Sequence, residues 1–414
     1  MGLREDAAAI AGELAELRHA IHREPEIGLD LPLTQAKVLA ALDGLPLEVS
    51  TGRKLSSVTA VLRGGSEPAG SPAGSSPGSS AGARPVVLLR GDMDALPVTE
   101  ATGLPYASRF PGVMHACGHD LHTAMLAGAA RLLSAHRAEL PGDVIFMFQP
   151  GEEGYRGADL MISEGVLDAA GPRRPEAAYA LHVSSTQLPC GVFTTRPGPM
   201  LAAADIIRVT VRGRGGHASQ PHLAADPITA ACSMVTALQT MVTRRFDVFD
   251  PVVVTISSFH AGTTDNVIPD EAVFLGTARS YSSAARDRLR GEIIRLINDL
   301  AGAQGVSADT QYIDEYPVTV NDPAEAEFAR AVAADVFGAA RSVPKTYPMT
   351  GAEDFSYVLQ QVPGAFISAG AVPLDVDPAT APSNHSATAR FDDAALADGT
   401  ALYAELARRR LLPA

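Results

Sequence analysis

The sequence contains few cysteines. Only Cys117, Cys190 and Cys232 occur among 414 residues, an odd number of thiols spread far apart. Secreted domains that depend on disulfides carry denser and usually even sets of cysteines. The pattern does not fit a disulfide framework, so each thiol requires its own explanation.

Long apolar runs and an excess of positive charge are also absent. No apolar run approaches the roughly 18 residues of a spanning helix, and the start is charged from Arg4 onward, without the apolar stretch of a signal peptide. Acidic residues outnumber basic ones by 47 to 33, and the resulting negative potential repels nucleic acids and anionic lipids. We therefore expect a soluble, cytoplasmic protein with neither nucleic acid nor membrane as a partner.

The composition does provide material for a core. Hydrophobic residues make up 46% of the chain, and at about 150 residues per domain the length predicts two or three domains. Residues 64–84 are almost entirely Gly, Ser, Pro and Ala, which bury too little surface to offset the entropy of ordering them. This segment lies between two strand-like runs, so we expect a flexible surface insertion within one domain.

Both ends of the chain alternate short apolar runs with helical patterns, which predicts an α/β layer with a mixed, mainly parallel sheet. The expected helices are 5–21, 34–42, 121–135, 158–164, 324–337 and 392–410, and the expected strands are 58–62, 86–89, 144–148, 177–181 and 365–367.

The middle of the chain has a different order. Strand 206–211, helix 227–243, strands 252–257 and 273–277, helix 284–300 and strand 308–313 give β-α-β-β-α-β, the ferredoxin-like arrangement. We predict one α/β domain formed by residues 1–199 and 314–414, and an inserted α+β domain at 200–313.

Polar residues follow three of the predicted strands. Asp92 and Asp94 come after 86–89, Glu152 and Glu153 after 144–148, and His182 directly after 177–181. In an open α/β sheet the carboxyl ends of the strands form the ligand-binding edge, so these side chains are expected to meet there. Taken singly, His182 fits a hydrogen-bonded core histidine and the two glutamates fit a solvated turn.

A fourth cluster opens the helix 121–135. Cys117, His119 and His122 lie close together, and the helix start and the imidazoles favour a thiolate at Cys117. Three interpretations are open for Cys117: a metal ligand, the nucleophile of a thiol hydrolase, and an inert buried side chain. Cys190 and Cys232 have only the last interpretation.

Glu152 and Glu153 stand between Gly151 and Gly154, which permit a backbone kink that aims both carboxylates. Metal-assisted hydrolysis needs two such carboxylates, one to bind the ion and one to take a proton from metal-bound water and deliver it to the leaving amine. The carboxylates at the other strand ends favour metal over thiol chemistry.

The residues also resemble a known family. Six motifs in order are similar to those of the N-acyl-amino-acid amidohydrolases, which include hippurate hydrolases and auxin-conjugate hydrolases and are related to the co-catalytic zinc aminoacylases and carboxypeptidases. These motifs are Gly91-Asp-Met-Asp-Ala-Leu-Pro97, His115-Ala-Cys-Gly-His-Asp-Leu-His122, Gln149-Pro-Gly-Glu-Glu-Gly154, Gly215-Gly-His-Ala-Ser-Gln-Pro-His222, Asn266-Val-Ile-Pro269 and Gly351-Ala-Glu-Asp-Phe355.

The resemblance implies a binuclear metal centre in the α/β domain. Its implied general base is Glu152, and Asp94 would orient a ligand, while the role of Asp92 stays open because the wider group has a histidine there. The implied ligands are Cys117 as the bridge between the ions, His119, Glu153, His182 and His385. The expected cofactors are two divalent ions per subunit, zinc or manganese, with cobalt or nickel as alternatives.

The inserted domain resembles the family's lid and dimerisation domain, which implies a homodimer. His217 would stabilise the developing oxyanion of an active site across the dimer, and Asn266 and Arg279 would hold the substrate. From the residues alone, His217 also fits a turn histidine and Arg279 a solvated charge at a strand end.

The sequence thus predicts an amidohydrolase that cleaves small N-acyl amino acids, hippurate-like or N-acetyl, to a carboxylate and an amino acid. The first alternative is an exopeptidase or dipeptidase of the same fold. The alternatives of other classes are a thiol hydrolase and a non-catalytic, metal-dependent binding protein.

Overall fold

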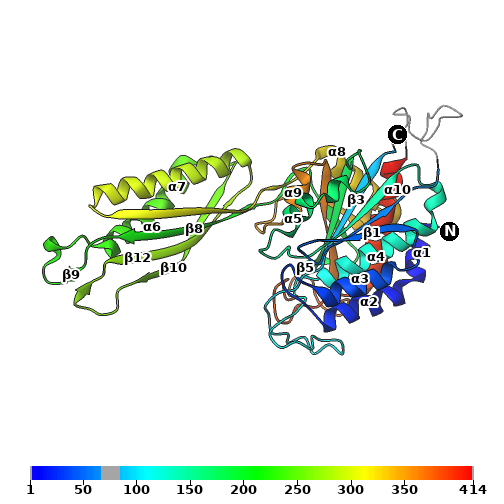
Figure 1. The fold of residues 1–414 in the computed structure, drawn as a ribbon, viewed down its shortest axis with the longest axis horizontal. Helices are drawn as coiled ribbons and strands as arrows, with labels where there is room; N and C mark the ends of the chain where they lie inside the picture. Colours follow the sequence, from blue (N-terminus) through cyan, green and yellow to red (C-terminus); the bar gives the residue numbers. More distant parts are fainter. Residues whose placement is uncertain (1, 67–83, 413–414) are drawn as a thin grey trace. The chain divides into compact units, whose positions relative to one another are not determined.

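The computed structural model describes residues 2–66 and 84–412 (Figure 1). These residues form two compact units: unit 1 comprises Met1–Gly198, Val320–Tyr347 and Tyr357–Ala414, and unit 2 comprises Pro199–Thr319 and Pro348–Ser356. Most of the predicted insertion at 64–84 lies outside the described residues. Among those described, no helix is both long and apolar enough to cross a membrane.

Unit 1 is built on an eight-stranded mixed sheet, which confirms the predicted α/β class. Strand β3 lies between β4 and β5 and is parallel to both, and β16 is parallel to β5. In spatial order the strands are β1 (Leu47–Thr51), β2 (Val58–Leu62), β4 (Asp143–Gln149), β3 (Val86–Asp92), β5 (Ala177–Pro189), β16 (Gly364–Val372), β6 (Phe193–Thr195) and β15 (Ser342–Pro344).

The main helices of unit 1 pack around this sheet (Figure 1). Helix α4 (His119–Ala135) contacts β3 and is buried over most of its length, because alanine, glycine and leucine occupy nearly every side of it. The others are α1 (Leu3–Ala9), α2 (Ala11–Arg23), α3 (Pro32–Leu42), α5 (Gly157–Ser163), α8 (Pro323–Phe337), α9 (Ser356–Leu359) and α10 (Ala394–Leu411).

Several predicted element bounds in unit 1 are wrong; the strand expected at 86–89, for example, runs to Asp92. The expected helix 5–21 is two helices, because the backbone leaves the helical region at Ile10 (φ −101°, ψ 5°). The strand expected at 177–181 continues to Pro189, because it keeps pairing with β16 beyond its apolar run, and Ser368 lies opposite His182. His182 therefore lies within β5 rather than after it.

Unit 2 contains a four-stranded antiparallel sheet with the order β10-β12-β8-β13, as expected for the ferredoxin-like arrangement. Its elements are β8 (Ala203–Arg212), α6 (Pro227–Arg245), β10 (Val252–Ala261), β12 (Glu271–Ser280), α7 (Ser283–Ala303) and β13 (Ser307–Tyr316). Short two-stranded sheets join β7 (Gly198–Leu201) to β14 (Thr319–Asn321) and β9 (Gly216–His217) to β11 (Val267–Ile268). Since β13 continues to Tyr316, unit 2 extends beyond the predicted limit at 313.

A buried ionic network joins α2 to the start of α4. Arg18 Nε lies 3.0 Å from Asp120 Oδ2, and both side chains are fully buried. His22 Nδ1 lies 2.9 Å from the same oxygen, and its Nε2 lies 3.3 Å from Glu100 Oε1. The network fixes the first turn of α4, which begins two residues after Cys117.

Replacing Arg18 with Met should destabilise unit 1 by about 3–5 kcal/mol, because it leaves the buried Asp120 carboxylate with one of its two cationic partners. The urea midpoint of the metal-free protein measures this effect. The exposed pair Arg131–Glu13 is the matched comparison, and Glu13→Ala should cost less than about 1 kcal/mol. Equal effects of the two substitutions would contradict the argument.

The same network should make the free energy of unfolding decrease at alkaline pH. Burial alone lowers the pKa of His22, but Asp120 and Glu100 outweigh it and raise that pKa to about 9. A raised folded-state pKa adds stability that is complete below the unfolded value near 6.5 and is lost as the pH rises through about 9. The urea midpoint of unfolding should therefore decrease as the pH rises from about 7 to 10, and His22→Gln should make this decrease smaller.

Candidate metal centre

The strand register explains why residues distant in sequence meet. Asp92 lies opposite Gln149, and Arg90 lies opposite Ala180. The residues that follow β3 and β4, and His182 in β5, are therefore side by side at one edge of the sheet. Helix α4 begins at this edge after Gly118, whose positive φ of 85° allows the chain to turn into the helix.

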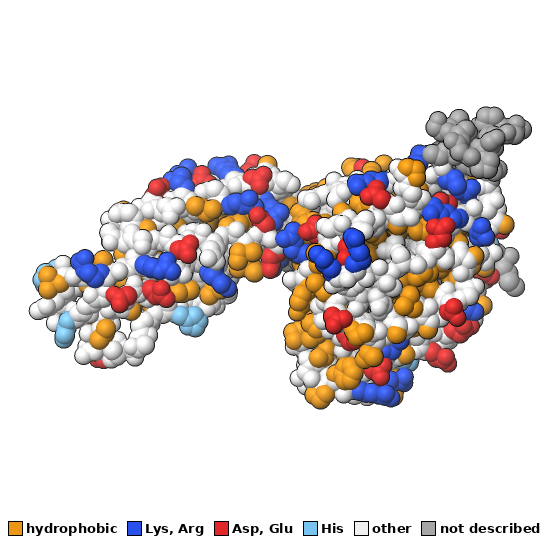
Figure 2. Space-filling model, in the orientation of Figure 1, with side chains coloured by type: hydrophobic (Ala, Val, Ile, Leu, Met, Phe, Trp, Pro, Cys, Tyr) orange, Lys and Arg blue, Asp and Glu red, His pale blue; other side chains and the backbone are white. Residues whose placement is uncertain are grey.

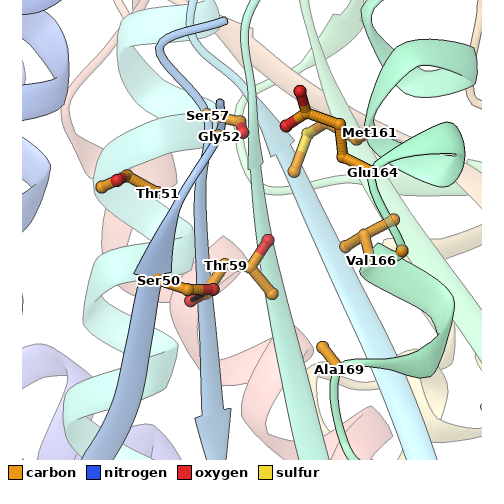
Figure 3. A pocket seen from close by; sticks show the side chains of 10 residues that line it. Ser50, Thr51, Gly52, Ser57, Thr59, Met161, Glu164, Val166 and Ala169 are labelled. Carbon is orange, nitrogen blue, oxygen red and sulfur yellow. Dashed lines mark hydrogen bonds between the residues drawn. The ribbon is translucent and has the colours of Figure 1, made fainter. Parts of the chain in front are cut away.

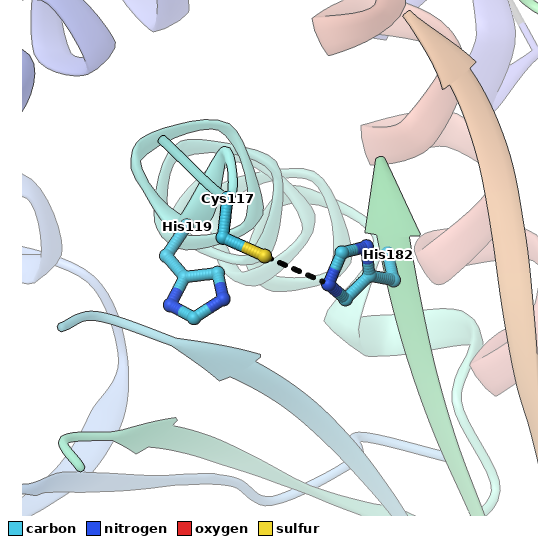
Figure 4. A group of neighbouring side chains, drawn as sticks. All are labelled: Cys117, His119 and His182. Carbon is cyan, nitrogen blue, oxygen red and sulfur yellow. Dashed lines mark hydrogen bonds between the residues drawn. The ribbon is translucent and has the colours of Figure 1, made fainter. Parts of the chain in front are cut away.

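The predicted ligands form two overlapping groups that share Cys117. Cys117, His119 and His182 form one group, and Cys117, Glu153 and His385 form the other; in each, the candidate ligand atoms lie within 4.8 Å of one another. Cys117 Sγ lies 3.4 Å from His182 Nε2 (Figure 4) and 3.2 Å from His385 Nε2. His385 Nε2 is also 3.2 Å from Glu153 Oε1. A thiolate between two such groups can bridge two ions.

Asp94 holds the two glutamates and one histidine in place. Its Oδ1 accepts from the backbone N–H of Glu152, and its Oδ2 accepts from that of Glu153, both at 3.0 Å. The backbone carbonyl oxygen of Asp94 lies 2.8 Å from His119 Nδ1, which leaves Nε2 as the ring nitrogen that can bind a metal. The positive φ of Gly151 (72°) and Gly154 (87°) gives the kink expected around the glutamates.

Asp92 is engaged with protein groups on both oxygens. Oδ1 lies 2.5 Å from His122 Nδ1, and Oδ2 accepts from Arg90 Nη1 at 2.6 Å. His122 Nε2 in turn accepts from the backbone N–H of Val183 at 2.8 Å. Although Asp92, His119 and His122 are close enough to hold an ion, these hydrogen bonds favour a supporting role for Asp92 and His122.

The electrostatics of the site suit a cation. Burial raises the pKa of Asp92, but Arg90 and the imidazoles of His119 and His122 hold it well below its usual range, so Asp92 is ionised. Burial and His122 lower the pKa of His182, which keeps the ring neutral, the form that binds metals. Hydrogen bonds to Cys117 and Glu153 raise the pKa of His385 to about 10, so negative charge surrounds this ring.

One buried atom tests whether a metal fits. His119 Nε2 is fully buried and makes no hydrogen bond within the described part of the chain; Asp92 Oδ2, at 3.6 Å, is beyond hydrogen-bonding distance. A buried imidazole nitrogen without a partner is costly unless a ligand satisfies it. His119 belongs to one candidate group with Cys117 and His182 and to another with Glu152 and Glu153, so the donor set fits a divalent ion.

The remaining predicted site residues lie in unit 2. His217 is in β9 and is exposed, with Nδ1 accepting from the Ser219 backbone N–H at 3.1 Å. Asn266 is exposed, and its backbone carbonyl accepts from the Ala218 backbone N–H, while Arg279 is in β12 and half-buried. Their roles in binding substrate stay predictions.

A separate cavity in unit 1 has a different character (Figure 3). It has a volume of about 240 Å³ and is lined by hydroxyls, including those of Ser57 and Thr59, and by Glu164. Both Glu164 carboxylate oxygens already accept backbone N–H groups, from Arg53 and Lys54. Without histidine, cysteine or a second carboxylate in its lining, this cavity lacks the groups for metal-assisted hydrolysis.

Comparison with known proteins agrees with this centre. The model of peptidase family M20/M25/M40 matches residues 88–409, a range that contains every candidate ligand. The chain belongs to this family. It is accordingly a metal-dependent hydrolase of amide bonds.

Individual relatives span nearly the whole chain. The IAA-amino acid hydrolase ILR1-like 4 of Arabidopsis thaliana is 36% identical over 96% of this chain and 85% of its own. Thermostable carboxypeptidase 2 of Saccharolobus solfataricus is 35% identical over 89% of this chain and 88% of its own. The crystal structure of YxeP from Bacillus subtilis, a dinuclear metal-binding M20 peptidase, has a TM-score of 0.79 at 30% identity and covers 98% of this chain and 99% of its own.

Proposed function

We propose that this M20 hydrolase cleaves the amide bond of small N-acyl amino acids, hippurate-like or N-acetyl, to give a carboxylate and an amino acid. The observation that carries the proposal is a buried carboxylate, Glu152, beside a complete set of donors for two ions. An N-acetyl-L-cysteine deacetylase of Bacillus subtilis, 34% identical over 86% of this chain and 79% of its own, supports this substrate class.

The proposed ligands follow the two groups. Cys117 would bridge, with His119 and His182 on one ion and Glu153 and His385 on the other. Two divalent ions at such a site would polarise the scissile carbonyl and lower the pKa of water. Zinc suits the soft thiolate and the imidazoles, and manganese, cobalt and nickel are the other candidates.

Glu152 is the proposed general base and acid. Its side chain is 6% exposed and lies with His119 and Glu153 in one candidate group. Asp94 fixes the Glu152 backbone, so the carboxylate can take a proton from the attacking water and deliver it to the departing amine. The neighbouring Glu153, held close to His385, stays at the metal and does not carry the proton.

A substrate screen separates the proposal from its alternative. The 35% identity to a carboxypeptidase favours exopeptidase or dipeptidase activity as the second candidate. Protein reconstituted with each candidate metal should hydrolyse N-acetyl and N-benzoyl amino acids with higher kcat/KM than free dipeptides. The opposite ranking would assign the chain to the peptidases of the family.

Metal removal tests the thiol-hydrolase alternative. Chelation should abolish amide hydrolysis, and adding a divalent ion should restore it, because the attacking water is activated only with ions in place. A thiol hydrolase would keep its activity in chelator and lose it on alkylation regardless of metal. Activity that survives complete demetallation would overturn the proposal.

We also propose a homodimer in which His217 of unit 2 acts on the active site of the partner chain, with Asn266 and Arg279 holding the substrate. Mixing inactive Glu152→Gln and His217→Ala chains tests this arrangement, because a mixed dimer contains one site with both groups intact. Recovery of activity on mixing is the expected result. An active, strictly monomeric enzyme would contradict it.

A further inference from the structure

Asn384 makes an unusual number of contacts for a half-buried loop residue. Its Nδ2 donates to the backbone carbonyl of Cys117 at 3.2 Å and to that of Val183 at 3.0 Å, and it lies 3.9 Å from Cys117 Sγ. Its Oδ1 accepts from the backbone N–H of Ser185 at 2.9 Å and from its hydroxyl at 3.0 Å. Donors on one side and acceptors on the other fix the orientation of the amide.

These contacts join the three chain segments that carry Cys117, His182 and His385. Val183 directly follows His182, and its carbonyl, besides accepting from Asn384, lies 2.9 Å from His182 Nδ1. That contact leaves His182 Nε2 facing Cys117 Sγ. Asn384 also directly precedes His385, which has a positive φ of 71° that is uncommon for a non-glycine residue.

The amide nitrogen of Asn384 has two hydrogens, and the carbonyls of Cys117 and Val183 are its nearer acceptors, so its approach to Cys117 Sγ at 3.9 Å is the weakest of the three contacts. Outer-shell hydrogen bonds of this kind orient metal ligands. His182, His385 and Asn384 are distant from Cys117 in sequence, yet they lie 3.4, 3.2 and 3.9 Å from its Sγ.

We propose that Asn384 is a positioning residue of the metal centre. It binds no ion; it holds Cys117, His182 and His385 at fixed relative positions through its bonds to the backbone beside them. This inference rests on the proposed function, because it requires Cys117 to be a metal ligand.

Cobalt(II) binding tests the inference without relying on activity. The wild type is to be compared with three variants. Asn384→Ala removes the side chain, and Asn384→Leu keeps a branched side chain without polar atoms. Ser383→Ala, at an exposed neighbour, is the control. The measurements are the cobalt affinity by competition titration and the thiolate-to-cobalt charge-transfer band. Both Asn384 variants should bind about 10- to 100-fold more weakly and shift the band, while Ser383→Ala should match the wild type.

The possible outcomes test the metal centre and the role of Asn384 separately. A wild type without any thiolate band would contradict the metal centre itself. A wild type with the band, and Asn384 variants with unchanged band and affinity, would overturn the role of Asn384 and leave the centre intact. The urea midpoint of each metal-free variant shows whether it is folded; if Asn384→Ala is unfolded, Asn384→Leu decides the result.

Discussion

Replacing Glu152 with Gln should lower kcat by about 10²- to 10⁴-fold, the range that a positioned proton-transfer group contributes, while the protein keeps its full metal content. The substitution preserves the shape of the side chain and the backbone bond to Asp94. It removes only the ability to accept a proton. The loss should therefore appear in kcat, with little change in metal affinity.

Glu164→Gln is the matched control for this substitution. Glu164 directly follows helix α5 of unit 1. Its carboxylate lines the hydroxyl-rich cavity and accepts backbone N–H groups. Steady-state kinetics and metal analysis of both variants complete the test. If Glu152→Gln turns over like the wild type, Glu152 is not the base.

Replacing Cys117 with Ala should lower the affinity for both ions at once, by more than the 10- to 100-fold loss that is typical when an outer-shell partner is removed. The reason is geometric: Cys117 is the one residue common to the group with His182 and the group with Glu153 and His385. His385→Ala, by contrast, removes a donor from one group alone. Metal stoichiometry after dialysis should fall to near zero for Cys117→Ala and to about one ion for His385→Ala.

Cys190→Ala provides the control for the thiol. Burial raises the pKa of Cys190 to about 11, and none of the candidate metal groups among the described residues contains this thiol. Metal content should be unaffected by its removal. Retention of both ions by Cys117→Ala would disprove the bridging role.

The sequence was sufficient to predict the donors that follow strong local patterns. Cys117 and His119 stand at the start of a long apolar helix, and Glu152 and Glu153 follow a strongly apolar strand, so their positions at the sheet edge could be inferred. The ferredoxin-like order of unit 2 was predictable for the same reason, since its strands and helices have clear periodicity.

Other features could not be derived from local pattern. His385 lies in an irregular loop, and only the family resemblance identified it. Strand β1 was missed because its residues are mostly exposed and polar, and β6 and β15 because three residues carry no periodicity. Asn384 was missed because its importance comes from contacts with Cys117 and Ser185, which are distant in sequence.

Side chains of both charges are mixed on the face of the molecule that Figure 2 draws, and neither unit shows a continuous basic field there. The formal net charge of −14 agrees with this distribution.

The most direct test of this account is a crystal structure of the metal-loaded protein with anomalous diffraction at the metal edge. We expect two peaks, each about 2.3 Å from Cys117 Sγ when the ions are zinc. One should lie beside His119 and His182 and the other beside Glu153 and His385. A fully loaded protein with no ion pair at Cys117 would contradict the account.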